Sequence, residues 1–212
     1  MKNEKNTIIN NDFINKNHLD SRPIIAILPG SRRQEILRML PTMIQVANQY
    51  NDYQFIIAGI TQQKNLYDKI LNGQNIKIVF NQTYDLLSNS HAAMVTSGTA
   101  TLETALFGVP QVVCYKANHL SYIIAKHLIS GIQYISLVNL IANKSIVTEL
   151  IQNDMNPQLL KTELDSIIAN CPKRNDILLE YKQLQNIMGD GNTTKKIAQL
   201  MVELLNKKYQ KQ

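Results

Sequence analysis

Short apolar segments that alternate with amphipathic stretches constrain the fold of this chain more than any other feature. Five such segments are bounded by Gly, Pro, Asn or Ser: PIIAIL at 23–28, YQFIIAG at 53–59, IKIVF at 76–80, AAMV at 92–95 and PQVVCY at 110–115. Between them, apolar residues recur at helical spacing. Continuously apolar strands are typical of a parallel sheet joined by right-handed crossovers. The sequence therefore predicts an α/β, Rossmann-like domain of about five or six parallel strands with helices on both faces.

The two ends of the chain differ from this central part. Residues 1–22 are rich in Asn and Lys and lead to Pro23, so we expect a linker or disordered lead-in there, followed by one domain over 23–212. From about residue 145 the sequence keeps helical spacing without a further clear strand, which predicts a helical carboxyl-terminal extension. Pro41 predicts an irregularity in the first long helix.

The composition of the chain indicates which classes of ligand and partner to expect. The formal charge of +6 suits an anionic ligand such as phosphate, but lysines near both ends contribute much of it, so we expect no nucleic acid partner. Cys114 and Cys171 lack metal-ligand spacing, which indicates free thiols in a cytoplasmic protein, and we expect neither a metal nor a cofactor. No apolar segment has the length of a membrane span or of an export signal, so any membrane contact is expected to be peripheral.

A cluster of small residues after the fourth apolar segment indicates a phosphate site. Ser97, Gly98, Thr99 and Ala100 are expected to form the turn into a helix at the carboxyl edge of the sheet, where ligands bind. Unpaired N–H groups at a helix start favour a phosphate, Gly98 permits close approach, and the hydroxyls of Ser97 and Thr99 can also donate. The alternative is that Ser97 or Thr99 simply caps the helix.

A second loop is expected at the same edge. Gly30, Ser31 and Arg32 follow the first strand, where the guanidinium could clamp a diphosphate, although a surface arginine at a helix start is the alternative. Glu103 lies four residues after Thr99 and could accept hydrogen bonds from a ribose diol; otherwise it is a solvated carboxylate. The sequence has neither G-x-G-x-x-G nor G-x-x-x-x-G-K-[ST], which disfavours nicotinamide cofactors and P-loop chemistry.

Three ordered motifs carry a family resemblance. LPGSRRQEI at 28–36, TSGTATLETALFGVPQVVCY at 96–115 and ISLVNLIANKSIVTELIQ at 135–152 resemble the carboxyl-terminal half of lipid-A-disaccharide synthases. The resemblance covers about residues 22–205 and implies one half of a GT-B glycosyltransferase of a Gram-negative bacterium. The implied reaction of lipid A biosynthesis transfers 2,3-diacylglucosamine from UDP-2,3-diacylglucosamine to the 6-hydroxyl of 2,3-diacylglucosamine 1-phosphate and releases UDP.

The resemblance also implies roles for individual residues. Arg32 would contact the diphosphate, the turn from Ser97 to Ala100 would hold the phosphates, and Glu103 would hold the ribose. Tyr115 and Asn139 would line the cleft, against the alternatives of a packed strand-end aromatic and a turn residue.

The amino-terminal half of the resembled enzyme has no counterpart in this sequence, so we expect a truncated chain or the product of a split gene. The catalytic residues and the acceptor site are expected on that half, and none in this chain. The carboxylates expected near the carboxyl edge are Glu35, Asp85 and Glu103, of which Glu35 could equally be a first-turn helix acid. His91 is expected at the opposite edge of the sheet.

Other functions and partners remain open. The chain could be a free-standing nucleotide-sugar-binding subunit of a split glycosyltransferase, or an enzyme resembling UDP-N-acetylglucosamine epimerase. The expected partners are UDP, UDP-2,3-diacylglucosamine and the amino-terminal acceptor domain. A homodimer is a further possibility. The stretch HLSYIIAKHLISGIQYI at 119–135 could rest on the inner face of the inner membrane or on an acyl chain, or be a core helix.

Overall fold

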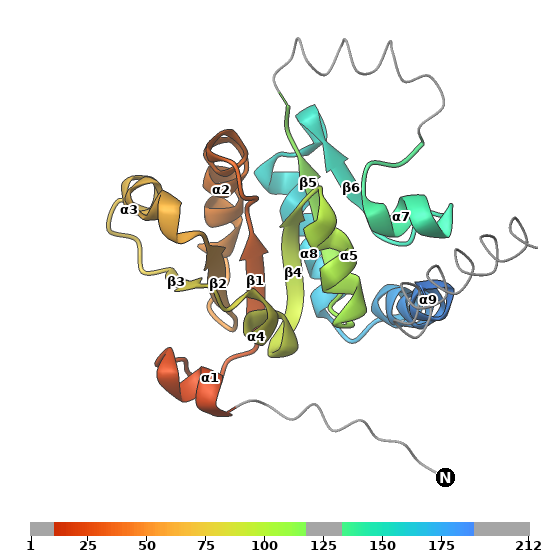
Figure 1. Cartoon of the computed structure of the whole chain (residues 1–212), viewed down its shortest axis with the longest axis horizontal. Helices are drawn as coiled ribbons and strands as arrows, with labels where there is room; N and C mark the ends of the chain where they lie inside the picture. Colours follow the sequence, from red (N-terminus) through yellow and green to blue (C-terminus); the bar gives the residue numbers. More distant parts are fainter. Residues whose placement is uncertain (1–10, 118–132, 189–212) are drawn as a thin grey trace, which may run out of the picture.

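A six-stranded parallel sheet forms the centre of the molecule (Figure 1). The computed structural model describes residues 11–117 and 133–188. The strand order is β3-β2-β1-β4-β5-β6, and every neighbouring pair is parallel. The strands are β1 (Ile24–Leu28), β2 (Gln54–Gly59), β3 (Lys77–Phe80), β4 (Ser90–Thr96), β5 (Gln111–Tyr115) and β6 (Glu149–Ile151). The predicted Rossmann-like architecture is confirmed.

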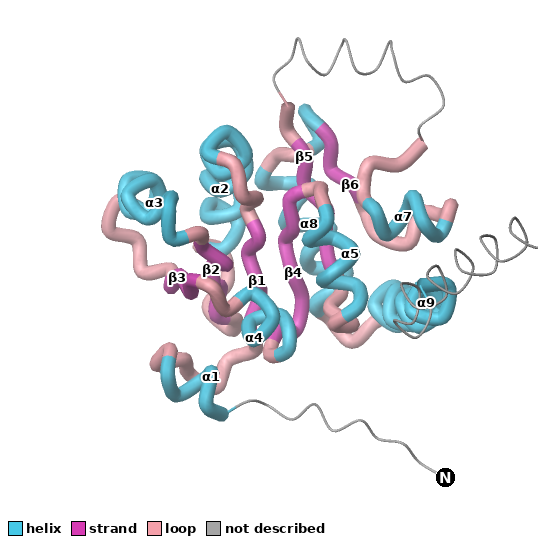
Figure 2. Tube along the Cα trace, in the orientation of Figure 1, coloured by secondary structure: helices cyan, strands magenta, loops and turns pink. Residues whose placement is uncertain are grey.

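Helices cover both faces of the sheet, as Figure 2 shows. Side chains alternate along β1: Ile25 and Ile27 pack in one core, and Ile24, Ala26 and Leu28 in the other. The first core lies beneath α2, α3 and α8, and the second beneath α1 and α4. The helices are α1 (Asn11–Lys16), α2 (Arg33–Ala47), α3 (Lys64–Leu71), α4 (Thr83–Ser88), α5 (Thr99–Leu106), α7 (Leu137–Ala142), α8 (Pro157–Ile168) and α9 (Pro172–Met188), with short 3-10 turns at Thr61–Gln63 and Gln152–Asp154.

Strand β6 corrects the expectation that no strand follows residue 145. Glu149–Ile151 pairs with Val113–Tyr115 at the edge of the sheet, and Leu150 packs in the first core. The strand has three residues, too few to display a period of two, and the apolar residues around it also fit helical spacing. Helices α8 and α9 agree with the predicted helical extension.

Part of the predicted lead-in is folded. Phe13 of α1 is 3% exposed and packs in the second core with Leu86 and Leu87, so disorder is not found in the described part of the expected linker or disordered lead-in. The domain boundary near residue 22 stays a prediction. Helix α2 runs through Pro41 without a break. Pro41 has no N–H to donate to the carbonyl of Leu37, but both residues are exposed, Leu37 by 44%, so water can reach this carbonyl.

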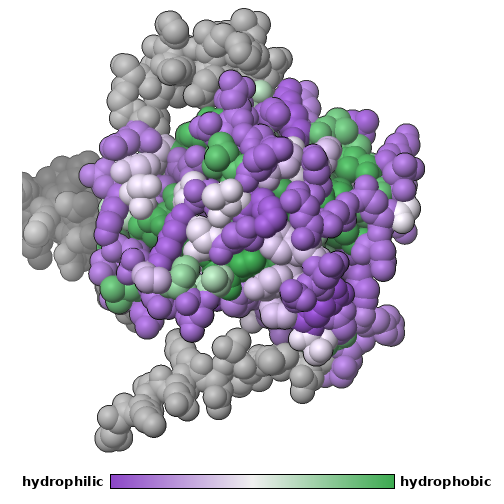
Figure 3. All heavy atoms as spheres, turned by 180° about the vertical axis from the view of Figure 1, so that it is seen from behind, coloured by the Kyte–Doolittle hydropathy of each residue, from purple (hydrophilic) through white to green (hydrophobic). Residues whose placement is uncertain are grey.

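The surface seen from behind is mainly hydrophilic, with scattered hydrophobic side chains (Figure 3). Within residues 11–117 and 133–188, no helix combines the length and apolar character needed to cross a membrane. Most of the basic and aromatic stretch at 119–135 lies outside the described residues, as does the end of the predicted helical extension after residue 188.

Candidate functional site

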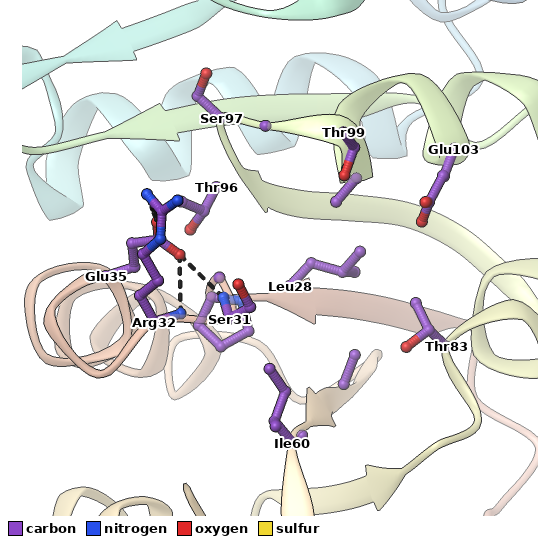
Figure 4. Close-up of a pocket in the computed structure, with 16 residues that line it drawn as sticks. Leu28, Ser31, Arg32, Glu35, Ile60, Thr83, Thr96, Ser97, Thr99 and Glu103 are labelled. Carbon is purple, nitrogen blue, oxygen red and sulfur yellow. Dashed lines mark hydrogen bonds and ion pairs between the residues drawn. The ribbon is translucent and has the colours of Figure 1, made fainter. Parts of the chain in front are cut away.

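The sheet topology places a pocket where strands β1 and β4 lie side by side. After β1 the chain crosses toward β2, whereas after β4 it crosses toward β5, so the loops at their carboxyl ends diverge and leave a crevice. The pocket has a volume of about 460 Å³, within the usual size of a ligand site. Its lining comprises Leu28–Arg32, Glu35, Ala58–Ile60, Thr83, Thr96–Ala100 and Glu103 (Figure 4). The two loops predicted from sequence thus meet in one pocket.

Glu35 fixes the loop between β1 and α2. Its carboxylate accepts hydrogen bonds from the backbone N–H of Ser31 at 3.0 Å and of Arg32 at 3.1 Å. Gly30 has φ +98°, and a Cβ built there would lie 2.5 Å from Glu35 Oε2. Only glycine therefore allows the carboxylate to lie against this turn. Glu35 caps the start of α2, which agrees with its alternative reading as a first-turn helix acid.

The Arg32 side chain is available to a ligand. It is 85% exposed and lines the pocket, and its only described charged partner is Glu35, at 3.6 Å between Nη1 and Oε1. An ion pair of this length at an exposed position contributes little. An anion in the pocket could therefore draw the guanidinium toward itself.

The turn between β4 and α5 offers backbone donors. Gly98 is the N-cap of α5, and a Cβ built on it would meet no atom within 4 Å, so the space above the turn is open. In the described part of the chain, the amides of Thr99 and Ala100 make no hydrogen bond, whereas the amide of Thr101 donates to the carbonyl of Gly98 at 3.2 Å. Unpaired amides at a helix start attract an anion.

The Ser97 hydroxyl does not behave as predicted. It donates to the carbonyl of Ile135 at 2.9 Å, and the Ser97 amide donates to the carbonyl of Cys114 at 3.0 Å. The side chain thus ties the turn to the segment before α7 and is not a free phosphate donor. The Thr99 hydroxyl, in contrast, is exposed and has no hydrogen bond among the described residues.

Glu103 faces the pocket from the first turns of α5, across from Arg32 in Figure 4. It is partly buried and forms no ion pair within the described ranges. The carboxylate is therefore free to accept hydrogen bonds from a neutral ligand group. Its separation from Arg32 suits a ligand that has a charged end and a hydroxyl-bearing end.

Asn139 and Tyr115 do not line the pocket. Asn139 is fully buried and uses its whole amide within the protein: Nδ2 donates to Val147 and Glu149, and Oδ1 accepts from Ile146 and Val147. This corrects the expectation that Asn139 lines the cleft, because no polar atom is left for a ligand. Tyr115 is half-buried at the end of β5, outside the set of lining residues.

Other titratable groups were also placed by the structure. Asp85 is exposed in the first turn of α4, the helix that follows β3, and does not line the pocket. His91 lies at the start of β4, at the opposite edge of the sheet as expected, with Nε2 2.7 Å from the carbonyl oxygen of Ile168. Burial lowers the pKa of His91, and the nearby charge of Arg174 lowers it further, against the effect of the Ile168 carbonyl. The described residues contain no group of three or more potential metal ligands.

Several lining residues were not predicted from sequence. Leu28, Ala58 and Ile60 form apolar parts of the wall, and Thr83 and Thr96 add hydroxyls. Thr96 is only 5% exposed, and its Oγ1 has no hydrogen-bond partner. The sequence around a threonine at the end of an apolar strand does not indicate whether its hydroxyl will be buried without a hydrogen-bond partner.

Comparison with protein families gives the site its context. The family model described as lipid-A-disaccharide synthetase matches residues 1–209. The chain belongs to this family. Lipid-A-disaccharide synthases are glycosyltransferases, so the loops described above belong to a sugar-transferring family.

Curated members of the family show how much of the enzyme is represented. The lipid-A-disaccharide synthase of Syntrophus aciditrophicus is 35% identical over 86% of this chain and 50% of that protein. The same enzyme of Coxiella burnetii is 33% identical over 92% of this chain and 53% of that protein. The chain spans about half the length of the curated relatives it matches.

Similar solved structures support the fold. A putative UDP-N-acetylglucosamine 2-epimerase of Listeria monocytogenes has a TM-score of 0.55 at 15% identity, covering 92% of this chain and 48% of the other. The calicheamicin glycosyltransferase CalG4 has a TM-score of 0.56 at 13% identity, covering 88% and 44%. These likenesses show the fold alone, that of one half of a GT-B protein.

Proposed function

We propose that this chain binds the nucleotide of UDP-2,3-diacylglucosamine and forms the donor-binding half of a lipid-A-disaccharide synthase. In the proposed reaction the sugar passes to the 6-hydroxyl of 2,3-diacylglucosamine 1-phosphate, and UDP is released. The observation that carries the proposal is the meeting of Arg32, the open α5 turn and Glu103 around one pocket. Family membership supplies the substrate class.

The proposed pose follows from the charges of the pocket. The diphosphate lies between the Arg32 guanidinium and the free amides of Thr99 and Ala100. Glu35 does not oppose it strongly, because its carboxylate is already occupied by two amides and by Arg32. Gly30, Ser31, Ser97 and Gly98 contribute by the shape of their loops.

Glu103 is proposed to accept hydrogen bonds from the ribose hydroxyls. A carboxylate beside a diphosphate is repelled unless it has a partner of another kind, and the described residues offer it none. Because Glu103 lies across the pocket from Arg32, the ribose in this proposed pose would lie away from the guanidinium. The nucleotide would thus be held at two chemically different points.

Thermal unfolding with nucleotides tests this assignment. UDP should raise the melting temperature much more than ADP at the same concentration, since a ligand at a hundredfold excess over its Kd stabilises the native state by about 2.7 kcal/mol. Calorimetric titration with UDP, UDP-N-acetylglucosamine and ADP then gives the Kd values. Equal shifts with UDP and ADP would refute the uridine assignment.

Catalysis is proposed to need the other half of the enzyme. Transfer of the sugar to a hydroxyl requires a base that takes up the proton of that hydroxyl. Of the carboxylates expected at this edge, Glu35 caps a helix, Glu103 has the proposed ribose role, and Asp85 lies outside the pocket. The 212-residue chain alone should therefore form no disaccharide from the two lipid substrates, as a chromatographic product assay would reveal. Turnover by this chain would refute the proposed division of roles.

A free-standing nucleotide-sugar-binding subunit of a split glycosyltransferase is the second candidate. In that case, adding the amino-terminal half as a separate protein should restore disaccharide formation without covalent linkage. Restoration only in a fused chain would favour the single-chain enzyme. The expected cytoplasmic location, peripheral at the inner membrane, and a homodimer also stay predictions; vesicle co-sedimentation and light scattering test them.

A further inference from the structure

The hydrogen-bond donors around the pocket divide into two groups. The amides of Ser31 and Arg32 are bonded to Glu35, and the hydroxyl of Ser97 is bonded to Ile135. The second group has no hydrogen-bond partner in the described chain, and it includes the amide and hydroxyl of Thr99, the amide of Ala100 and the hydroxyl of Thr96. Thr99 and Ala100 lie at an open helix start, where water can reach them. Thr96 is different.

The Thr96 hydroxyl is buried and unpaired. Thr96 is 5% exposed at the end of β4, it lines the pocket, and its Oγ1 is out of reach of solvent. Buried hydroxyls are almost always hydrogen-bonded, because removing one from water without a new partner is unfavourable. The only other unpaired buried oxygen or nitrogen among the described side chains is Gln111 Oε1, at the far end of the neighbouring strand.

The Thr96 side chain points toward the side of the pocket that is formed by the loop between β1 and α2. Along β4, Ala92 and Met94 pack in the core beneath α2, and alternation puts Thr96 on the same face. This is the side of the pocket where α2 begins, and Figure 4 draws Thr96 on the side of Arg32 and Glu35, with its oxygen toward the pocket. A donor there faces the space in which the proposed diphosphate lies.

We propose that the Thr96 hydroxyl donates a hydrogen bond to a phosphate oxygen of the bound nucleotide, and that this bond forms only on binding. The inference rests on the proposed function. Phosphate oxygens are strong acceptors, and a threonine hydroxyl needs only to rotate its O–H to donate. The pocket wall must shift slightly to expose the oxygen, because Thr96 Oγ1 is closed to solvent in this structure.

A pair of substitutions at Thr96 tests the inference. Thr96→Val keeps the shape and removes the hydroxyl; it should leave the melting temperature of the unliganded protein unchanged or higher, because it removes an unpaired buried group. It should raise the Kd of UDP about tenfold or more and leave that of uridine unchanged, since a bond to a charged acceptor is lost. Thr96→Ser keeps the hydroxyl and should bind UDP like the parent.

Thr104→Val is a matched control. Thr104 is also a buried threonine, but its hydroxyl already donates to the carbonyl of Ala100 at 2.7 Å, and it does not line the pocket. This variant should bind UDP like the parent and should not gain stability.

Three outcomes would overturn the inference: parent-like UDP binding by Thr96→Val, an equal loss of uridine binding, or a loss of UDP binding in Thr96→Ser as large as in Thr96→Val. A parent protein that does not bind UDP would instead refute the proposed function. Calorimetric titration of parent and variants with UDP and uridine therefore separates the two failures.

Discussion

Replacing Gly30 by alanine would show how the first pocket loop is held. A Cβ at this position lies 2.5 Å from Glu35 Oε2 and 2.7 Å from Glu35 Cβ. Turning the carboxylate away relieves the first contact, but only a backbone shift relieves the second. Either movement breaks the hydrogen bonds from the amides of Ser31 and Arg32. The start of α2 should then lose its cap.

The loss of stability has two parts. A non-glycine residue in the left-handed region loses about 1–2 kcal/mol. Loss of a helix cap adds about 0.5–2 kcal/mol, so Gly30→Ala should lower the free energy of unfolding by about 1.5–4 kcal/mol in all. Gly73 and Gly108 separate these parts, because their φ values are +83° and +72° and a Cβ on either meets no atom within 4 Å. Alanine at those positions should lose only the first part.

Urea unfolding followed by circular dichroism measures the difference. With a slope of about 2 kcal/mol per M, a further loss of about 1 kcal/mol moves the midpoint of Gly30→Ala roughly 0.5 M below those of the two control variants. Equal midpoints for all three variants would refute the role assigned to Glu35. A lower midpoint for Gly30→Ala alone would support it.

Three further predictions concern the ligand and acid stability. Arg32→Ala should raise the Kd of UDP about tenfold to a hundredfold and leave uridine unaffected in calorimetric titration; unchanged UDP binding would reduce the loop to an ordinary helix start. Glu103→Ala should weaken UDP and uridine by similar factors and 2′-deoxy-UDP less; a variant that binds all three like the parent would make Glu103 a solvated carboxylate. Both must first melt like the parent, since Leu102 and Leu106 flank Glu103. The pKa of His91 is lowered from 6.5 in the folded protein, so the unfolded chain binds the proton more readily and the free energy of unfolding decreases as the pH falls below about 6.5. His91→Gln should make this decrease smaller in urea titrations between pH 7 and pH 5. An equal decrease in the variant and the parent would contradict the role of His91.

The fold could be predicted from sequence because five of its strands lie in mainly apolar segments that alternate with amphipathic ones. The segments that contain β1 to β5 are mainly apolar and are bounded by Gly, Pro, Asn or Ser. This pattern is typical of a parallel sheet that is covered on both faces. Strand β6 could not be predicted, since its three residues include Glu149. That carboxylate accepts hydrogen bonds from the amides of Ile135 and Ser136, and such distant partners leave no local pattern.

The position of the candidate site could be predicted, but not the state of each donor in it. Gly30 to Arg32 and Ser97 to Ala100 follow two strands whose carboxyl ends share an edge, so their meeting follows from topology. Whether the Ser97 hydroxyl is free depends on Ile135, which is distant in sequence. The same holds for Asn139, whose partners make it a packing residue although its motif indicated a cleft residue. Local sequence specifies which donors are present, whereas tertiary contacts decide which are used.

The pairing of β1 with β4 makes the pocket depend on contacts between segments distant in sequence. Strands β1, β2 and β3 pair with their neighbours along the chain, but β4 must return across this whole unit to reach the open edge of β1. Pairings between segments distant in sequence form slowly, because a long loop must close first. An intermediate folded only through β3 would have the Arg32 loop without the α5 turn. A nucleotide that needs both would bind only after the centre of the sheet has closed, and would then oppose its reopening.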